Sequence, residues 1–421
     1  REWGNLFGTL KEVRQDGRPV AAGGDDGWNA LEARLPQAAR LLADIRRIEK
    51  TEIGAVNYAQ EKIRLRLKKL SAQGRGEGPE AARLKEELGA WQARYAEMET
   101  ALGALKKQDT AGVVVAAAGG QEKELPLTQI VRAYRPNAMG PGAKAAFYAA
   151  KVWEFVSDDP RESNTEGGVF PAIFGTVMMV MIMSLVATPL GVLAAFYLRE
   201  YAKQGPFVSA VRIAVNNLAG VPSIVFGVFG VGFFVYFVGG SLDRLFYPES
   251  LPTPTFGTGG ILWASLTLAL LTLPVVIVAT EEGLAAIPGG LREASLALGA
   301  TKFETTWRIV LPAVMPSILT GLILAMARAA GEVAPLMITG VVKLAPALPL
   351  DSFWPILHLD RKFMHLGFHI YDVGFQSPNV DAARPMVFTT TLLLLGIVLV
   401  LNLAAIVLRN RLRKRYSLGT L

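Results

Sequence analysis

Five segments of this chain are long, apolar and free of charged side chains, and they constrain its fold more than any other feature. A helix needs roughly 20 apolar residues to cross the hydrocarbon core of a bilayer. Each segment is close to or above this length and lacks Asp, Glu, Lys and Arg: Val169–Leu198, Ile213–Leu242, Ser250–Thr280, Ile309–Ala327 and Pro385–Leu408. The sequence therefore predicts an all-α membrane protein with five visible transmembrane helices in a domain spanning residues 166–421.

The distribution of Lys and Arg indicates the orientation of these helices, because cytoplasmic loops carry an excess of positive charge. A basic cluster, Arg409–Arg415, follows the last segment and places the C-terminus in the cytoplasm. Basic residues place the links 199–212 and 281–311 on the same side. With five spans, residues 1–165 then lie on the opposite, periplasmic side. Since no signal peptide or earlier span precedes them, we expect Arg1 to follow a missing segment that contains a first transmembrane helix.

Composition excludes several kinds of site. The chain has no cysteine, so disulfides and thiolate metal sites are not available. The basic loops and helices account for the net charge of +7, and no nucleic-acid-binding motif is present. There is also no G-x-x-x-x-G-K-[ST] phosphate loop, so we expect no ATP hydrolysis by this chain and no cofactor of its own.

Residues 1–165 contain two periodic apolar stretches separated by a polar, glycine-rich turn at Ser71–Pro79. In the second stretch the spacing alternates between four and three, as in a coiled-coil seam: Leu84, Leu88, Trp91, Tyr95, Met98, Leu102 and Leu105. We predict an antiparallel coiled-coil hairpin over about residues 31–107. It would be a docking arm for a periplasmic partner; a structural hairpin without a partner is the alternative.

Three shorter segments follow the hairpin. Val113–Ala118 and Leu127–Tyr134 are candidate extended segments, and Lys144–Phe155 is a candidate amphipathic helix. Aromatic side chains favour the membrane interface. We therefore expect this helix to lie on the outer surface of the membrane.

A polar insertion, residues 281–312, separates the third and fourth apolar segments. Its apolar residues recur at helical spacing: Leu284, Ile287, Leu291, Ala294 and Leu298. Gly299 suits the positive φ of a helix C-terminus, and Thr301 and Glu304 have the spacing of a capping box that starts another helix. We predict two short helices around a glycine turn, rigid enough to transmit force to a soluble partner. An ordinary amphipathic loop is the alternative.

Arg328 and Glu332 are the most conspicuous charges, because they interrupt an apolar helix that runs from about Pro312. Charged residues inside a membrane usually face the bundle interior or an aqueous path, and a spacing of four places these two on one helical face. The planar guanidinium of Arg328 matches an oxyanion such as phosphate, and Glu332 would hold it between substrates. The alternative is a structural ion pair that joins two helices.

Asn217 and Ser223 are further candidates for a substrate path, because Pro222 interrupts backbone hydrogen bonding between them. Broken helices often line transport paths, although ordinary helix packing would explain these polar residues equally well. His365 and His369 have the i, i+4 spacing of zinc ligands on a helix. We favour a polar, aromatic-rich loop at this position and predict no metal site.

The insertion resembles the EAA loop of binding-protein-dependent ABC importer permeases, which would couple the chain to a cytoplasmic ATPase. The resemblance rests on Glu293-Ala294-Ser295, on Gly299 and on Ile309-Val310-Leu311-Pro312, with Ser295 in place of the family's usual second alanine. Three other segments make residues 169–421 similar to the A-type permease subunits (PstA) of phosphate importers: Leu198–Gly205, Asn216–Gly227 and Ala327–Met337. Residues 1–165 and Leu357–Val380 resemble a long variant with an enlarged periplasmic domain.

The resemblance implies a type I ABC importer permease in the bacterial inner membrane that forms half of a phosphate pore. Its partners would be a C-type permease subunit, two cytoplasmic ATPase subunits that bind ATP and Mg, a periplasmic phosphate-binding protein and membrane lipid. Within this class, the alternative is a permease for another oxyanion or small polar solute. Outside it, the alternatives are a membrane-anchored periplasmic scaffold or sensor and a secondary transporter.

Overall fold

The computed structural model describes residues 6–117, 119–161, 164, 166–351, 354–377 and 380–416, and for residues 382 and 412–416 the backbone alone. Arg1, Ala118 and most side chains of the predicted basic cluster Arg409–Arg415 lie outside this description. The chain divides into two compact units. The N-terminal unit comprises Trp3–Ala149 and Pro248–Leu251, and the membrane unit comprises Ala150–Tyr247 and Pro252–Leu421.

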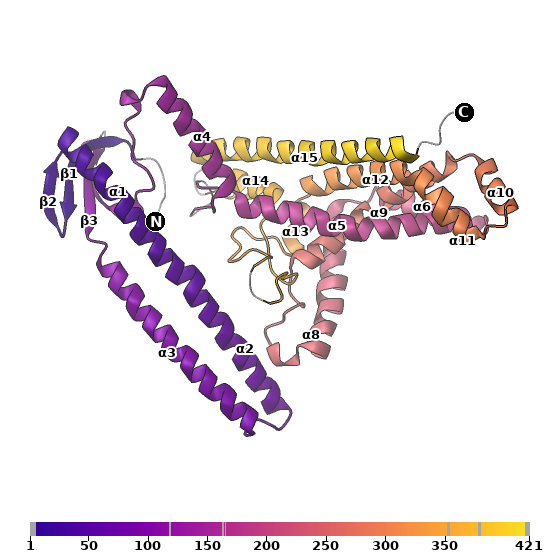
Figure 1. The fold of residues 1–421 in the computed structure, drawn as a ribbon, viewed down its shortest axis with the longest axis horizontal. Coiled ribbons are helices and arrows are strands. Elements are labelled where there is room, and N and C mark those ends of the chain that lie inside the picture. Colours follow the sequence, from indigo (N-terminus) through magenta and orange to yellow (C-terminus); the bar gives the residue numbers. More distant parts are fainter. Residues whose placement is uncertain are drawn as a thin grey trace. The chain divides into compact units, whose positions relative to one another are not determined.

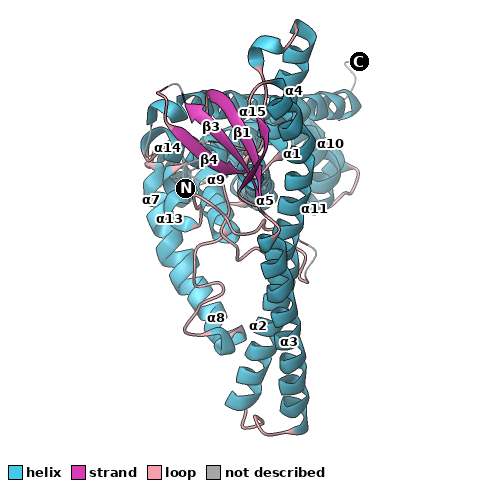
Figure 2. Cartoon of the chain, turned by 90° about the vertical axis from the view of Figure 1, so that its left-hand side faces the viewer, coloured by secondary structure: helices cyan, strands magenta, loops and turns pink. Residues whose placement is uncertain are grey.

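The N-terminal unit contains a four-stranded antiparallel sheet (Figure 2). Its order is β2-β1-β3-β4, with bounds Arg18–Ala22, Gly8–Gln15, Ala111–Ala117 and Glu122–Pro126. Val13 of β1 pairs with Val113 of β3, and both are buried against Leu31 of helix α1 (Asp25–Arg46). Val113–Ala118 is therefore extended as expected, up to Ala117. Leu127–Tyr134 is not, because Pro126 ends β4 and a 3-10 turn, Leu127–Gln129, follows.

Helices α1 (Asp25–Arg46) and α2 (Ile53–Ala72), joined by the π-helical segment η1 (Arg47–Glu52), form one arm of the predicted hairpin. Helix α3 (Pro79–Lys107) is the antiparallel second arm (Figure 1). The arms pack through a small apolar cluster near the turn: Ile63, Leu67, Leu70, Ala81, Leu84, Leu88 and Trp91. The structure thus contains a helical hairpin, longer at its N-terminal end than predicted; coiled-coil packing along its full length remains a prediction.

The membrane unit is almost entirely helical, in agreement with the predicted fold class. Helix α4 (Pro141–Ser157) begins in the N-terminal unit and continues into the membrane unit. The helical segments that follow it are α5 (Phe170–Phe196), η5 (Tyr197–Tyr201), α6 (Pro206–Leu218), α7 (Ser223–Phe229), η6 (Gly230–Gly239), α8 (Gly240–Phe246), α9 (Ile261–Ala285), α10 (Gly289–Ala297), α11 (Lys302–Thr305), η8 (Thr306–Val310), α12 (Leu311–Gly331), α13 (Ala334–Thr339), α14 (Leu366–Phe375) and α15 (Val380–Tyr416).

Five helical stretches in the described residues are long and apolar enough to cross a membrane, as the sequence analysis predicted. They are Phe170–Tyr201, Ser223–Phe246, Ile261–Ala285, Lys302–Gly331 and Ala383–Arg411. The fourth span begins at Lys302, earlier than the predicted Ile309, and two other spans begin later than predicted. The second span begins at Ser223 and not at Ile213, because Pro222 cannot continue α6. The third begins at Ile261 and not at Ser250, because the preceding residues form a loop rich in Pro and Gly.

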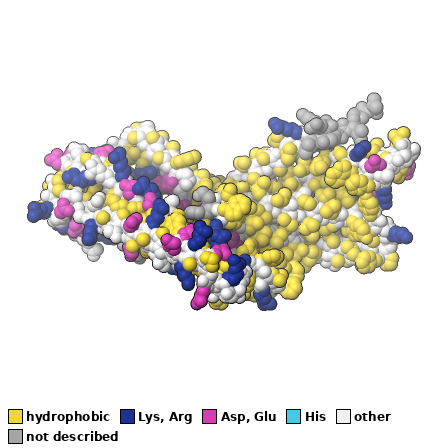
Figure 3. Space-filling model, turned by 60° about the horizontal axis from the view of Figure 1, so that its bottom comes forward, with side chains coloured by type: hydrophobic (Ala, Val, Ile, Leu, Met, Phe, Trp, Pro, Cys, Tyr) yellow, Lys and Arg dark blue, Asp and Glu magenta, His cyan; other side chains and the backbone are white. Residues whose placement is uncertain are grey.

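Helix α9 is the buried centre of the membrane unit, packed between α5 and α12. Glycines allow close approach on both sides: an added Cβ at Gly191 of α5 would lie 2.7 Å from Val276, and one at Gly321 of α12 would lie 2.8 Å from Ala279. Such small residues let membrane helices pack tightly. On the face that Figure 3 shows, hydrophobic side chains cover most of this unit, as expected for contact with lipid.

Candidate coupling loop and substrate path

The candidate coupling loop, residues 286–310 between α9 and α12, contains two short helices around a glycine turn. Helix α10 ends at Ala297, and Gly299 follows with φ of 86°, a left-handed conformation that favours glycine. The predicted capping box then begins α11: Glu304 N donates to Thr301 Oγ1 at 3.2 Å, and Thr301 N donates to Glu304 Oε2 at 2.9 Å. The glycine and both caps thus have the roles that the sequence predicted.

The apolar stripe of this loop was assigned to a single helix, and that assignment was wrong. Leu284 is the buried end of α9, because Pro288 separates α9 from α10. Leu298 lies beyond the end of α10 and is 90% exposed. The break at Pro288 lets α10 turn away from the membrane helix that precedes it (Figure 1).

A buried hydrogen bond joins the two short helices. Ser295 of α10 and Thr305 of α11 are both almost completely buried, and their hydroxyl oxygens are 2.9 Å apart. Ser295, which replaces an alanine in the resemblance, therefore makes a specific contact. Glu293 and Ala294, in contrast, are exposed, and Leu311 and Pro312 lie in the first turn of α12.

Four large apolar side chains on the coupling loop are exposed on this chain. They are Leu296, Leu298, Phe303 and Trp307, with Leu298 90%, Phe303 65% and Trp307 62% exposed. Phe303 and Trp307 stack with ring centroids 6.3 Å apart. A cluster of exposed apolar residues next to charged ones is typical of a protein-docking surface.

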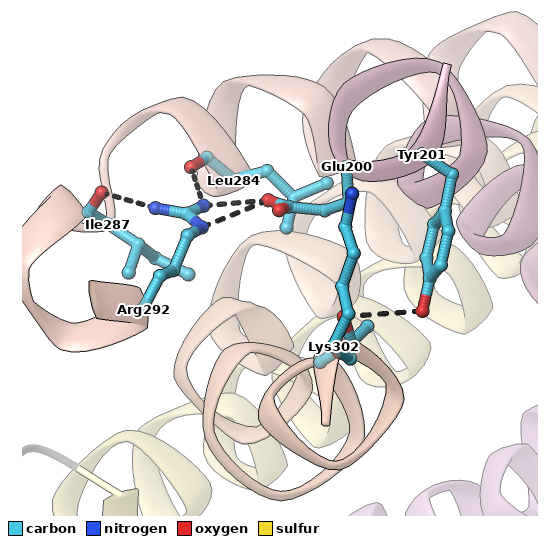
Figure 4. Close-up of polar contacts among 7 residues, drawn as sticks. Glu200, Tyr201, Leu284, Ile287, Arg292 and Lys302 are labelled. Atoms are coloured by element: carbon cyan, nitrogen blue, oxygen red, sulfur yellow. Dashed lines mark hydrogen bonds and ion pairs between the residues drawn. The ribbon is translucent and has the colours of Figure 1, made fainter. Parts of the chain in front are cut away.

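Arg292 makes four hydrogen bonds that tie α10 to its neighbours, and the sequence analysis did not predict them (Figure 4). Its Nε and Nη2 donate to Glu200 Oε1 at 3.1 and 2.8 Å, Nη1 donates to Ile287 O at 3.0 Å, and Nη2 also donates to Leu284 O at 2.9 Å. The sequence analysis used the segment Leu198–Gly205 for the orientation of the helices and for the family resemblance. Its Glu200, 92 residues before Arg292, gave no local signal of this contact.

Arg328 and Glu332 form an ion pair, with Arg328 Nε 3.6 Å from Glu332 Oε1. They do not share a helical face as predicted, because α12 ends at Gly331 and Glu332 has an extended backbone. Both side chains are partly buried. The structure thus contains the predicted pair, while its contact with a substrate remains a prediction.

Asn217 and Ser223 flank a break between helices, as predicted. Asn217 is exposed in the last turn of α6, and Ser223 begins α7 after Pro222. Helix α7 packs closely on α13, since an added Cβ at Gly227 would lie 2.7 Å from Pro335 Cα. The helical structure is interrupted once before α7 and once between α12 and α13. Because α7 and α13 are neighbours, both interruptions adjoin the same pair of helices.

The loop predicted around the paired histidines was wrong, because residues 366–375 form helix α14 and both imidazoles are buried at or near its start. His365 caps this helix, accepting a hydrogen bond from Gly367 N at 3.1 Å through Nδ1. Burial lowers the pKa of His365 to about 3 and that of His369 to about 4, so both imidazoles are neutral near pH 7. Among the described residues, no group of three or more His, Asp or Glu side chains could hold a metal ion.

Comparisons with known proteins centre on the membrane unit. Residues 187–417 match the family described as the binding-protein-dependent transport system inner membrane component. The probable ABC transporter permease protein YqgI of Bacillus subtilis is 30% identical over 258 residues, which cover 60% of this chain and 81% of that protein. The phosphate transport system permease protein PstA of Yersinia pestis is 33% identical over 248 residues, covering 58% and 75%.

Other similar proteins match over a shorter stretch. The phosphate transport system permease protein PstA of Mycobacterium leprae is 39% identical over 195 residues, and the match covers 46% of this chain and 58% of that protein. Among solved structures, the inward-facing MetNI methionine ABC transporter is 20% identical with a TM-score of 0.39, covering 65% of this chain and 99% of that chain. A bacterial alginate ABC transporter is 15% identical with a TM-score of 0.43, covering 66% and 85%.

Proposed function

The chain belongs to the family of binding-protein-dependent transport system inner membrane components, and we propose that it carries inorganic phosphate into the cell as a permease subunit. Members of this family are the non-catalytic, membrane-spanning subunits of ABC importers, in which a separate protein hydrolyses ATP. Phosphate is supported by relatives named as phosphate transport permeases, one of which matches over 75% of its length.

The coupling loop carries the proposal of ATP-driven transport. Its two short helices are fixed to each other by Ser295 and Thr305 and expose Leu298, Phe303 and Trp307. A soluble ATPase subunit that binds these side chains could move the loop as a rigid body, and rigid-body movement is how packed domains switch between two states. Glu293, Ala294 and Gly299 lie on the exposed part of the same loop.

Arg328 supports an oxyanion as the cargo. Its guanidinium contacts Glu332 at 3.6 Å, which is long for a charge-assisted hydrogen bond, and it remains partly exposed. An arriving phosphate could therefore replace the carboxylate as its partner, because a planar guanidinium binds two phosphate oxygens at once. Asn217 and Ser223 would supply neutral hydrogen bonds along the path.

The same proposal assigns the partners and the orientation. A C-type permease would form the other half of the pore, and two cytoplasmic ATPase subunits would bind ATP and Mg. A periplasmic phosphate-binding protein would deliver the anion. Residues 1–165 would then be periplasmic, and the coupling loop and the C-terminus cytoplasmic.

Uptake of radiolabelled phosphate at low external concentration tests this function, in cells with the intact gene, without it, and with Gly299→Pro. Proline cannot adopt the φ of 86° at Gly299. Gly290→Ala is the matched control, because Gly290 is helical and an added Cβ would meet no described atom within 4 Å. We expect uptake to require the gene, ATP and Gly299, and to tolerate Gly290→Ala.

Each contrary result has a definite meaning. Uptake that is unchanged without the gene would refute phosphate as the cargo and leave another solute as the candidate. Uptake that ignores ATP depletion would indicate a secondary transporter. A function that survives Gly299→Pro would point to the N-terminal unit as the active part.

A further inference from the structure

The cytoplasmic end of α5 contacts both helices of the coupling loop. The π-helical segment η5 extends α5, and its Glu200 accepts two hydrogen bonds from Arg292 of α10. The next residue, Tyr201, contacts α11: Lys302 Nζ lies 5.0 Å from the centroid of its ring, and its hydroxyl lies 3.5 Å from Thr306 Oγ1 (Figure 4). Two adjacent residues of one helix end thus contact both halves of the loop.

The Arg292–Glu200 ion pair is well protected from water. The side chains of Arg292 and Glu200 are only 21% and 13% exposed. Arg292 also donates to the carbonyls of Leu284 and Ile287, which belong to the end of α9 and the turn after it. Because charge-assisted bonds in a partly buried site are stronger than surface ion pairs, Arg292 joins α10, α9 and η5 into one unit.

We propose that Arg292 and Glu200 are positioning residues that transmit movement of the coupling loop directly to α5. This inference rests on the proposed function, since it requires an ATPase that moves the loop. Backbone connections link the loop only to α9 and α12. The Arg292–Glu200 ion pair adds a third link, to α5, which packs along α9 through the whole membrane unit.

A neighbouring ion pair provides a matched control. Arg212 Nε donates to Glu281 Oε1 at 3.1 Å, and their side chains are 29% and 19% exposed. Like the Arg292–Glu200 pair, it joins distant segments of the same region, here α6 and α9. It does not involve α10. Loss of this pair should weaken local packing without separating the coupling loop from α5.

The test compares Glu200→Gln and Arg292→Lys with Glu281→Gln in the assembled transporter. Three quantities are measured: the ATPase subunit that co-purifies, the rate of ATP hydrolysis, and the phosphate taken up per ATP hydrolysed. Glutamine keeps the shape of Glu200 without its charge, and lysine keeps the charge of Arg292 without the planar fork. We expect both variants to retain the ATPase subunit and hydrolyse ATP, with uptake per ATP reduced about tenfold. Glu281→Gln should keep the wild-type ratio.

A charge exchange addresses variants that fail to fold. Glu200→Arg and Arg292→Glu each place two like charges together, whereas the double variant restores an attractive pair. Partial recovery of the uptake ratio in the double variant, relative to both single variants, is the expected result. A wild-type ratio in Glu200→Gln and Arg292→Lys would overturn the inference. So would loss of the ATPase subunit from these variants alone, because the pair would then only shape the docking surface.

A readout that does not depend on the cargo separates this inference from the phosphate assignment. The chain has no cysteine, so Phe170→Cys, at the exposed N-terminal end of α5, provides a single site for labelling with a maleimide. Trapping the ATPase with ATP and vanadate should change the rate at which this cysteine reacts with the maleimide in the wild-type background. With Glu200→Gln the rate should stay unchanged. Equal changes in both backgrounds would overturn the inference, even if phosphate proves to be the wrong solute.

Discussion

Gly299 offers the cleanest test of the coupling-loop geometry, because only its backbone conformation matters. Its φ of 86° places it in the left-handed region, and an added Cβ would meet no described atom within 4 Å. A substitution there therefore introduces strain without a steric clash. For an ordinary L-residue the left-handed conformation costs about 1–2 kcal/mol.

This cost predicts an order and a magnitude. Asn tolerates the left-handed region better than Ala, and a β-branched residue tolerates it worst. The affinity for the ATPase subunit should be highest with Gly at position 299 and should fall from Asn through Ala to Val. Because about 1–2 kcal/mol corresponds to a factor of about 5–30 in a two-state population, Gly299→Ala should raise the apparent dissociation constant by up to that factor.

The assay is titration of the purified ATPase subunit onto membrane vesicles that contain the permease. Gly290→Ala serves as the control, since Gly290 is a helical position with equal space around it, where alanine is favoured over glycine. Equal dissociation constants for Gly299→Ala and Gly290→Ala would refute the reasoning, because both add the same methyl group and differ only in backbone conformation.

Three further predictions concern other parts of the membrane unit. Arg328→Lys should impair phosphate uptake although it keeps the charge, because the two-pronged contact is lost; full uptake by Arg328→Gln would rule out contact with the anion. Thr305→Val should reduce the co-purified ATPase subunit by leaving the Ser295 hydroxyl buried without a partner, at a cost of about 1–3 kcal/mol, and adding Ser295→Ala should restore it; no recovery in the double variant would contradict this. The unfolded chain binds more protons than the folded one below pH 6.5, because burial lowers the pKa of His365 and His369 to about 3 and 4, so stability should fall as pH falls. Between pH 6.5 and 5 each histidine should lower the free energy of unfolding by about 1.6 kcal/mol; His369→Phe should roughly halve the fall in Tm over this range, and an identical slope would contradict the assignment.

Local features of the sequence predicted much of the membrane unit. A helix crosses the bilayer at a favourable free energy when about 20 consecutive residues are apolar and uncharged. Because this property can be read directly from the sequence, all five spans were predicted. Gly299, Thr301 and Glu304 were also assigned correctly, because a positive φ and a capping box depend on residues only a few positions apart.

Sequence reasoning was less accurate where two signals competed. The helical spacing from Leu284 to Leu298 was taken as one apolar face, yet Pro288 ends the first helix and reorients the second. Likewise, the break at Pro222 was predicted, but it was placed inside the second span because residues 213–222 contain no charged side chain; the span begins only after it. In the N-terminal unit, strands β1 and β2 were not anticipated, because β1 pairs with β3 about a hundred residues away and has little apolar alternation of its own.

The sequence by itself determined which segments enter the membrane and where the coupling loop turns, since hydropathy and backbone preference are properties of each segment alone. Only the tertiary structure decided which side chains the loop binds. Arg292 could have paired with any nearby carboxylate, and Glu200 is selected because the packing of α5 on α9 brings η5 beside α10. That choice depends on the shapes of packed helices, which no single segment contains.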